Sequence, residues 1–390
     1  MLLFTEGFDY LPTTADTTAG RQLLGKLLGG LGWYGSLDMN VTLDGRFGGK
    51  CLGYASTTSQ VNRYFAIPPV TQGYFGVAIY MAQSTNVTES SLFIPFAVSP
   101  YTAFNDAILG NVHASWQTTQ FSLDLDQFGN INVWRGYPWA NGVPNDDIAP
   151  SERLISTYSG AFPRNTWFYL EVGFKTDGAD TFLEVRINTE TVISLEDTVI
   201  ANISVTYPGV YAVDAVGFAR AFNSGGGQRI DDIYFCDATG TVNNTYLGNV
   251  RVQAIVPDAP GDLTEWTSFN GTMPNWQAAS NPNMDDTQYV FNLMANVGNR
   301  DLYSLEPLVN TPNIHGVTVK GAYRQDSGGQ AFVKNILKTG GSIVEGEAQP
   351  TMGSYYFIKD IFEINPISGV GWTYADINTL QIGPKLEDVI

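Results

Sequence analysis

The sequence contains few of the residues from which catalytic and metal sites are most often built. Its 390 residues include two histidines, His113 and His315, which lie far apart in the chain. The two cysteines, Cys51 and Cys236, have no partner at the spacing of a zinc site and make no disulfide framework. A G-x-S-x-G motif is absent, and the glycines at 225–227 are not followed by the Lys-Ser or Lys-Thr of a phosphate loop. We therefore expect a protein that is not an enzyme, with two buried free thiols.

Charge and long apolar runs are also scarce. Charged residues make up 15% of the chain, below the usual quarter, and the net charge of −18 would repel a phosphate backbone. No apolar run approaches the ~20 residues that span a bilayer. The N-terminus runs from Met1 straight to Glu6 and Asp9, without the basic region of a signal peptide. We expect a protein made in the cytoplasm, without nucleic-acid binding, cleavable export signal or membrane insertion.

Aromatic residues, glycine and proline are abundant by contrast. Aromatics reach 13%, and 41 Gly and 19 Pro supply many turns, which favours short strands over long helices. The composition becomes polar and rich in turns over residues 237–248, and the length suits two domains. The sequence therefore predicts an all-β chain. A β-sandwich over residues 1–240 is followed by a second, smaller antiparallel sandwich over residues 241–390.

Local patterns predict several elements within these domains. Alternating apolar residues indicate hairpins at 119–135 and 166–188, and Gly340-Gly341 indicates a third. Thr373 is placed to cap a short helix before residue 380. Pro68-Pro69 is expected to break a strand, and residues 250–257 are expected to form one.

Pairs of carboxylates are the remaining route to catalysis. Two acids two residues apart on a strand share a face, which Asp124 and Asp126 satisfy, whereas adjacent Asp231 and Asp232 should point to opposite faces. Asp124 and Asp126 are thus the pair to test for glycosidase chemistry, which needs two carboxyls around one bond.

The same two acids partly match a calcium loop. Phe128 stands where the third ligand should be, so a hairpin turn explains the segment better. Asp285 and Asp286 form a second acidic loop. No cofactor is expected, and calcium at these acids is the weak alternative.

Aromatic residues in loops are the remaining functional signal. Tyr137 and Trp139 lie in one such loop, with the loop at 223–227 as a possible neighbour in the fold, and Trp266 and Trp276 lie in two others. Aromatic rings in loops stack on sugars or anchor protein interfaces, or they are buried beneath a neighbouring loop or subunit.

Ordered motifs in the first half resemble a concanavalin A-like, laminin-G-type jelly roll. They are Glu6-Gly7-Phe8-Asp9, Phe121-Ser122-Leu123-Asp124, residues 129–133, Trp167-Phe168-Tyr169-Leu170-Glu171, residues 183–188 and Ile230-Asp231-Asp232-Ile233-Tyr234. The continuation at 236–258, with segments at 301–303, 314–317 and 372–383, is similar to tailed-bacteriophage virion structural proteins. These carry a lectin-like sandwich followed by a second β domain. The resemblance covers almost the whole chain, brings no catalytic residues, and leaves the calcium and sugar ligands of true lectins unmatched.

This resemblance implies a tail, fibre or capsid-decoration protein located in the virion. Such a protein would act through contacts with other virion proteins and with copies of itself. The alternative is a receptor adhesin that binds a host surface glycan, and a glycoside hydrolase using Asp124 and Asp126 is the third hypothesis.

Overall fold

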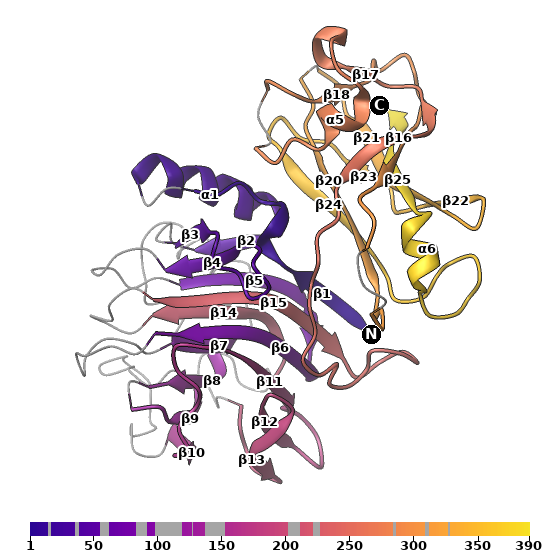
Figure 1. The fold of residues 1–390 in the computed structure, drawn as a ribbon. Coiled ribbons are helices and arrows are strands. Elements are labelled where there is room, and N and C mark those ends of the chain that lie inside the picture. Colours follow the sequence, from indigo (N-terminus) through magenta and orange to yellow (C-terminus); the bar gives the residue numbers. More distant parts are fainter. Residues whose placement is uncertain are drawn as a thin grey trace. The chain divides into compact units, whose positions relative to one another are not determined.

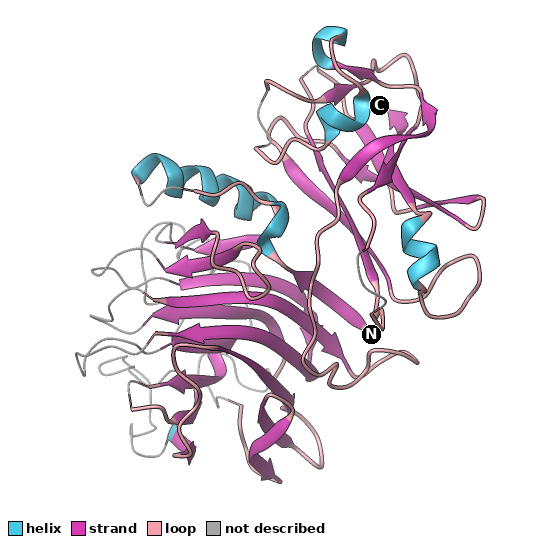
Figure 2. Ribbon diagram, in the orientation of Figure 1, coloured by secondary structure: helices cyan, strands magenta, loops and turns pink. Residues whose placement is uncertain are grey.

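The structure is a computed structural model in which strands predominate and helices are few (Figures 1 and 2). It describes residues 1–14, 17–35, 39–54, 62–82, 92–97, 119–126, 128–136, 153–201, 211–220, 227–283, 286–308, 312–326 and 328–390. The chain forms two compact units. Unit 1 comprises Met1–Phe8, Thr13–Leu28 and Gly32–Val252, and unit 2 comprises Asp9–Pro12, Gly29–Leu31 and Gln253–Ile390. The predicted all-β class is confirmed.

Unit 1 consists of two antiparallel sheets. Sheet A has the order β13-β12-β11-β6-β15-β4-β3, with β1 also paired to β15, and sheet B has the order β10-β9-β8-β7-β14-β5-β2. Sheet A contains β1 (Leu2–Glu6), β3 (Met39–Thr42), β4 (Cys51–Tyr54), β6 (Gln72–Met81), β11 (Trp167–Lys175), β12 (Phe182–Ile187), β13 (Glu190–Glu196) and β15 (Gln228–Asp237). Sheet B contains β2 (Trp33–Gly35), β5 (Asn62–Val70), β7 (Leu92–Ala97), β8 (Thr119–Leu125), β9 (Ile131–Arg135), β10 (Leu154–Tyr158) and β14 (Val213–Arg220).

The core of unit 1 lies between the two sheets and is rich in phenylalanine. Phe96 and Phe121 of sheet B stack with ring centroids 4.5 Å apart, and Phe121 meets Phe174 of sheet A at 5.1 Å. All three are fully buried, and burial of each such side chain contributes about 1.5–3 kcal/mol. Because side chains alternate along a strand, the residues between these rings must face away from the core. The predicted hairpins β8–β9 and β11–β12 are confirmed.

The expectation that Pro68-Pro69 breaks the strand is wrong, because β5 runs through both prolines. Val70 pairs with Val213 and Ala66 with Ala215, so the register shifts between these pairs. The prolines therefore fall in an irregular stretch of the ladder. On the other side of β5, pairing with β2 ends at Phe65, and no ladder bond is lost there.

Residues 241–252 pack on unit 1, against the side of sheet A that faces away from sheet B. The Glu171 carboxylate accepts hydrogen bonds from the Tyr234 hydroxyl at 2.5 Å and from the Gly248 backbone N–H at 2.8 Å. Tyr234 lies flat on the sheet because Gly76 has no side chain; a Cβ there would come within 2.1 Å of the Tyr234 ring. This segment, expected at the domain boundary, thus covers a buried polar cluster of unit 1.

Arg46 ties the same segment to a β-bulge in β15. One of its guanidinium nitrogens contacts Asp232 at 3.1 Å and the Val250 carbonyl at 2.8 Å, while its backbone N–H donates to Asp231. The expectation that Asp231 and Asp232 point to opposite faces is therefore wrong. An extra residue in the ladder and a positive φ of 50° at Asp232 turn both carboxylates toward Arg46.

Helix α1 (Thr18–Gly30) was not predicted, because its glycines resemble loop punctuation. It forms because Leu24, Leu27 and Leu28 recur at helical spacing and are fully buried. Within the described residues, no helix is both long and apolar enough to cross a membrane. Cys51 and Cys236 are free and buried, as predicted, and burial raises the pKa of the Cys51 thiol to about 11.

Unit 2 is a smaller antiparallel sandwich. Its main sheet, sheet C, has the order β16-β19-β25-β21-β22, with β23 also paired to β21, and a second sheet pairs β20 with β24. The strands are β16 (Pro257–Thr264), β17 (Thr267–Ser268), β18 (Val290–Phe291), β19 (Asp301–Leu305), β20 (Val317–Tyr323), β21 (Ala331–Thr339), β22 (Ser342–Glu345), β23 (Gln349–Pro350), β24 (Tyr356–Phe362) and β25 (Gln381–Val389). Helices α5 (Asn275–Ala279) and α6 (Tyr374–Asn378) complete it.

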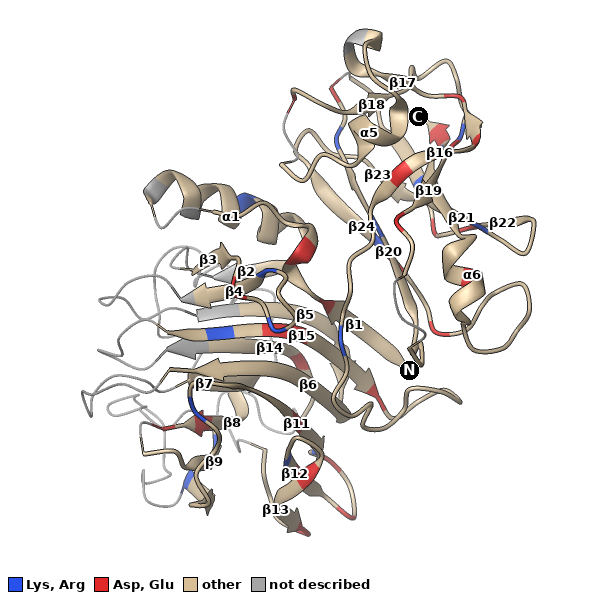
Figure 3. Ribbon diagram, in the orientation of Figure 1, with Lys and Arg blue, Asp and Glu red and all other residues tan. Residues whose placement is uncertain are grey.

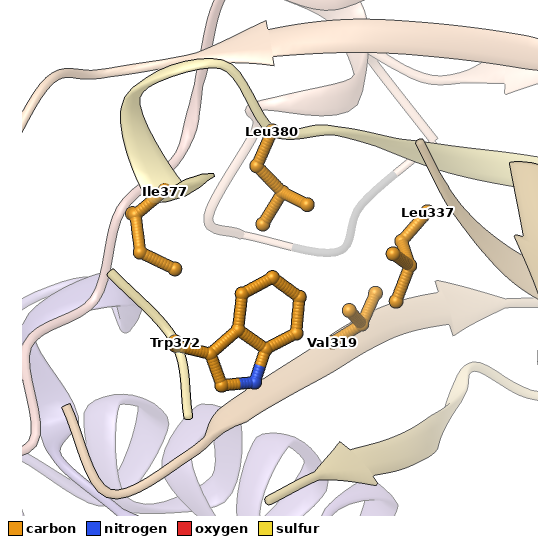
Figure 4. Packing of buried hydrophobic residues seen from close by; sticks show 5 residues of the cluster. All are labelled: Val319, Leu337, Trp372, Ile377 and Leu380. Carbon is orange, nitrogen blue, oxygen red and sulfur yellow. The ribbon is translucent and has the colours of Figure 1, made fainter. Parts of the chain in front are cut away.

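The core of unit 2 joins its two sheets. Figure 4 shows Trp372 between Val319 and Leu337 on one side and Ile377 on the other, and the indole donates to the Phe362 carbonyl at 2.8 Å. The Gly340-Gly341 hairpin is confirmed. The strand expected at 250–257 is wrong, since residues 251–256 form no strand and β16 begins at Pro257.

The predicted cap of α6 is confirmed and yields a stability prediction. The Thr373 hydroxyl accepts from the Asp376 backbone N–H, and the Asp376 carboxylate accepts from the Thr373 backbone N–H. Thr373→Ala should lower the free energy of unfolding of unit 2 by about 1 kcal/mol, measured by chemical denaturation. Thr373→Ser keeps the hydroxyl and should remain near wild type; an equal loss in both variants would show that the cap contributes nothing.

Candidate ligand-binding face

The candidate site is the outer face of sheet B, meaning the side that faces away from sheet A. Because Phe121, Leu123 and Leu125 of β8 are buried toward the core, the intervening residues of β8 project to this face. Strand pairing fixes the neighbours, with Trp134 directly opposite Ser122 and Asn132 opposite Asp124. The face consists of Gln120, Ser122, Asp124, Asn132, Trp134, Phe93, Pro95, Ala97, Ala215, Gly217 and Tyr64.

Aromatic rings and very small residues form the apolar part of this face. Gly217 of β14 has Tyr64 of β5 on one side and Pro95 of β7 on the other. A Cβ at Gly217 would lie 2.5 Å from the Tyr64 ring and 3.0 Å from Pro95, so the absent side chain leaves the space that the ring occupies. Figure 3 shows that most of the described strand residues of unit 1 are neither Lys or Arg nor Asp or Glu. Of the residues of this face, Asn132 and Trp134 are half-buried and the others are buried, and few carry a formal charge.

Three polar side chains on this face have buried atoms without partners. Oε1 of Gln120, Oδ1 of Asp124 and Nε1 of Trp134 are buried, and none has a hydrogen-bond partner among the described residues. Gln120 and Asp124 lie two residues either side of Ser122, so they are the two diagonal neighbours of Trp134 across the strand pair. An unpaired buried polar atom costs about 1–3 kcal/mol, so three on one face require an explanation.

The ionisation of Asp124 reflects this environment. Its side chain is 8% exposed. Desolvation is the main cause that raises its pKa to about 7, and the negative charge of Asp126 adds to it, while a hydrogen bond from Asn132 acts the other way. Among the described residues, no basic side chain is a main cause of this shift. Asp124 is consequently a hydrogen-bonding group of the face whose charge changes near neutral pH.

Asp126, the predicted partner of Asp124, serves the turn of the β8–β9 hairpin. Its Oδ1 accepts from the backbone N–H groups of Phe128 and Asn130, both at 2.9 Å, and its Oδ2 accepts from the side-chain amides of Asn130 and Asn132. Four donors thus surround this carboxylate, as in an Asx-turn. The structure brings the two acids near the same asparagine but gives them different surroundings.

Tyr137 and Trp139 lie outside the described residues, as does the loop at 221–226. The described chain shows how their loop begins. The Ser122 hydroxyl donates to the Gly136 carbonyl at 2.6 Å, and the Gly136 N–H donates to the Gln120 carbonyl at 3.0 Å. The loop therefore starts from a point fixed to the outer face of sheet B.

Trp266 and Trp276 belong to unit 2. The Trp266 indole donates to the Asn299 carbonyl at 3.1 Å and packs against the core cluster of Ala331, Val333, Ile358 and Leu386. Buried Asp301 holds this loop by accepting from the Trp266 backbone N–H and from the Asn275 amide. Trp276 follows Asn275 in α5 and is half-buried. Trp266 therefore contributes to packing.

The second acidic loop and the histidines form no metal cluster in the described chain. Asp285 lies outside the described residues, and Asp286 pairs with Arg324 at 2.7 Å and accepts from the Tyr355 hydroxyl. His113 also lies outside, and burial lowers the pKa of His315. Across the described ranges, no three His, Cys, Asp or Glu side chains gather as metal ligands would.

Sequence reasoning named Asp124 but missed Gln120, Trp134 and Tyr64. Alternation places Gln120 and Trp134 on the outer side of their hairpin, where polar residues ordinarily meet solvent. Gln120 is nonetheless buried, and so is the indole nitrogen of half-buried Trp134. The available signal was a tryptophan placed directly opposite Ser122 on a strand face that also carries an amide and a carboxylate.

Comparisons with known proteins give distant matches among solved structures. No protein-family model and no curated protein matches the chain. Among solved structures, a sialidase matches with a TM-score of 0.38 and 11% identity over 60% of this chain, which spans 18% of that protein. The exoplasmic/lumenal domain of VIP36, in its Ca²⁺/Man-bound form, matches with a TM-score of 0.35 and 8% identity over 54% of this chain and 84% of its own. A Bacillus subtilis protein of unknown function with a galectin-like fold matches with a TM-score of 0.36 and 9% identity. The match covers 60% of this chain and 94% of that protein.

Proposed function

We propose that this chain is a non-enzymatic carbohydrate-binding protein and that the outer face of sheet B is its binding surface. The observation that carries the proposal is the group of three unpartnered buried atoms on Gln120, Asp124 and Trp134. Neighbouring hydroxyl groups of a sugar both donate and accept hydrogen bonds, so one sugar supplies donors to the two oxygens and an acceptor to the indole. Aromatic rings of the face supply the apolar contact that the faces of sugar rings need.

The surroundings of the two acids support the absence of glycosidase activity. Hydrolysis of a glycosidic bond with retention needs two carboxyl groups about 5 Å apart around that bond, and inversion needs a somewhat larger separation. The Asp126 carboxylate is surrounded by four N–H donors in a turn, which leaves Asp124 as the sole carboxylate of the described face. We propose that the site works without a cofactor or a metal ion.

A glycan array tests this proposal. The wild-type chain should bind a defined set of glycans, and Trp134→Ala should lower the affinity for them about tenfold or more, because the indole donor and its ring are both lost. Phe128→Ala is the matched control, since Phe128 lies in the turn of the same hairpin and is 69% exposed. Silence of the wild-type chain on the array, or equal binding by Trp134→Ala, would contradict the proposal.

The resemblance to tailed-phage virion proteins supports a biological setting. We propose that the chain is a component of a virion, made in the host cytoplasm, and that the glycan lies on the host surface. Electron microscopy of particles labelled at the C-terminus tests this location. Density of the label on a tail or capsid would agree with it, and purified particles without the chain would contradict it.

A second candidate function is assembly through protein contacts, favoured by an exposed apolar loop of unit 2. Buried Asn365 organises the loop at 363–371 by accepting from the N–H of Ile367 and donating to Thr339. The loop exposes three apolar side chains, Ile364, Ile367 and Val370. A rigid loop with apolar side chains suits contacts with other virion proteins or with copies of this chain.

Substitution in this loop tests the assembly role. Val370→Asp should abolish self-association or binding to purified particles, measured by analytical ultracentrifugation and co-sedimentation, because a charge would be buried at the contact. Leu293→Asp alters an equally exposed apolar residue of unit 2 and should have no effect. A wild-type chain that stays monomeric and does not co-sediment with particles would contradict the assembly role.

A further inference from the structure

We infer that copies of this chain associate head to tail through unit 1, where Arg251 and Phe47 of one copy contact an acidic patch of the next. The acidic patch consists of Asp180, Glu196 and Asp197. The inference rests on the second candidate function, assembly, and names a contact between copies that lies in unit 1. It follows from the charge and the exposure of side chains at two places on sheet A.

Phe47 lies in a rigid turn between β3 and β4. The Gly45 backbone N–H donates to the Gly49 carbonyl at 3.0 Å, which closes the turn. The guanidinium of Arg46 pairs with Asp232 of β15 at 3.1 Å and fixes the turn to sheet A. Phe47 is nonetheless 54% exposed. Because the turn is already fixed, little conformational freedom is lost when a partner covers the ring.

Arg251 is an exposed cation beside this ring. The carbon of its guanidinium lies 4.8 Å from the centroid of Phe47, so the group is stacked on the ring. Within the described residues it forms neither an ion pair nor a hydrogen bond through its side chain. Lys50 of the same turn carries a charge of the same sign. The planar guanidinium therefore keeps its N–H donors for a carboxylate outside the chain.

The carboxylates around the turn already have other partners. Asp232 pairs with Arg46, whose backbone N–H also donates to Asp231 at 3.1 Å. Asp44 pairs with Arg229 at 3.1 Å. Each of these three acids is thus engaged by a group other than the stacked guanidinium.

The acidic patch lies where the turn between β11 and β12 meets the end of β13. The backbone N–H of Asp197 donates to the Thr181 carbonyl at 2.8 Å, which brings these two segments together. All three acids of the patch are exposed, and none forms an ion pair in the part of the chain that the structure describes. The cations nearby, Lys175 and Arg135, donate to backbone carbonyls. The patch therefore presents unpaired negative charge.

The order of strands in sheet A keeps the two sites apart within one copy. Strand β13 forms one edge of the sheet, and the β3–β4 pair forms the other. With a net charge of −18, two copies repel each other unless opposite charges face one another at the contact. The exposed guanidinium and the acidic patch supply such a pair. A contact between two different patches is heterologous, so it joins copies into a ring or an open chain.

Sedimentation equilibrium of the full-length chain tests the inference. The wild type should self-associate, and Arg251→Glu and Glu196→Arg should each weaken the association about tenfold or more. Two controls make the same changes of charge at other exposed positions of unit 1. Lys26→Glu in α1 and Glu190→Arg at the other end of β13 should leave the association unchanged.

A mixture of Arg251→Glu and Glu196→Arg provides the sharper measurement. The first variant keeps the acidic patch and the second keeps the stacked guanidinium, so together they should form heterodimers with wild-type affinity. Arg251→Gln brings no negative charge toward Asp232 and should weaken self-association in the same direction. This variant separates loss of the contact from damage to the fold.

Three results would overturn the inference: a wild-type chain that stays monomeric up to ~1 mM, self-association unchanged in both Arg251 variants, or a mixture that stays monomeric. A monomeric wild-type chain that still co-sediments with particles would overturn the inference alone and leave the assembly candidate in place. The glycan array tests the proposed function separately, because none of the substituted residues belongs to the outer face of sheet B.

Discussion

Asp124→Asn should make the stability of unit 1 less dependent on pH and should stabilise it at pH 8. In the folded chain the pKa of Asp124 is raised to about 7, whereas in the unfolded chain it ionises near the ordinary value of 3.8. Between these two values the folded state holds a proton that the unfolded state has released. Wild-type stability should therefore fall as the pH rises from about 4 to about 7 and stay low above that. At 1.36 kcal/mol per pKa unit, the difference is on the order of 4 kcal/mol.

Chemical denaturation of both proteins at pH 4.5 and pH 8 measures this effect. Asn is close to Asp in shape but does not titrate, so the two proteins should differ most at pH 8. Asp177→Asn, in an exposed turn of unit 1, provides the control and should follow the wild type. Parallel curves for wild type and Asp124→Asn at both pH values would mean that Asp124 is not held in a desolvated position.

Arg46→Ala should destabilise unit 1 by about 3–5 kcal/mol, because it breaks a buried ion pair and leaves one charge without its partner. Arg46 and Asp232 are 10% and 3% exposed, and burial already raises the pKa of Asp232. The guanidinium also lies over the Tyr169 ring, 5.0 Å from its centroid, and donates to the Val250 carbonyl. The substitution therefore also removes one of the contacts that hold residues 241–252 on sheet A.

The matched control for this prediction is Arg229→Ala. Arg229 pairs with Asp44, which is 63% exposed, so the loss should stay below about 1 kcal/mol. Hydrogen exchange should show increased exchange across residues 241–252 in Arg46→Ala and little change in Arg229→Ala. If both variants lost the same stability, the buried pair would have no special role in holding this segment.

Structural elements that depend on neighbouring residues were predictable from the sequence alone. The β8–β9 hairpin followed from alternation around Asp126, and α6 from a threonine at its N-cap, because each depends on residues close together in the chain. Long-range features were not. The bulge at Asp232 depends on Arg46, and the place of residues 241–252 depends on Glu171 and Tyr234.

The candidate site was predictable only in part for the same reason. Asp124 was found from its spacing to Asp126, but the two acids turned out to have different surroundings. Gln120 is buried on the side of sheet B that faces away from sheet A, and alternation along a strand does not predict this. The reason for a glycine at position 217 is evident only once strand pairing places the Tyr64 ring next to it.

The indole N–H signal of Trp134 tests the central claim most directly. In a ¹⁵N-labelled chain, each of the 8 tryptophans contributes one indole signal, and Trp134→Phe identifies the one that matters. Addition of a glycan that binds on the array should shift the Trp134 signal in proportion to saturation, because the sugar accepts a hydrogen bond from Nε1. A saturating glycan that shifts other indole signals and leaves that of Trp134 in place would contradict the assignment of the outer face of sheet B as the binding surface.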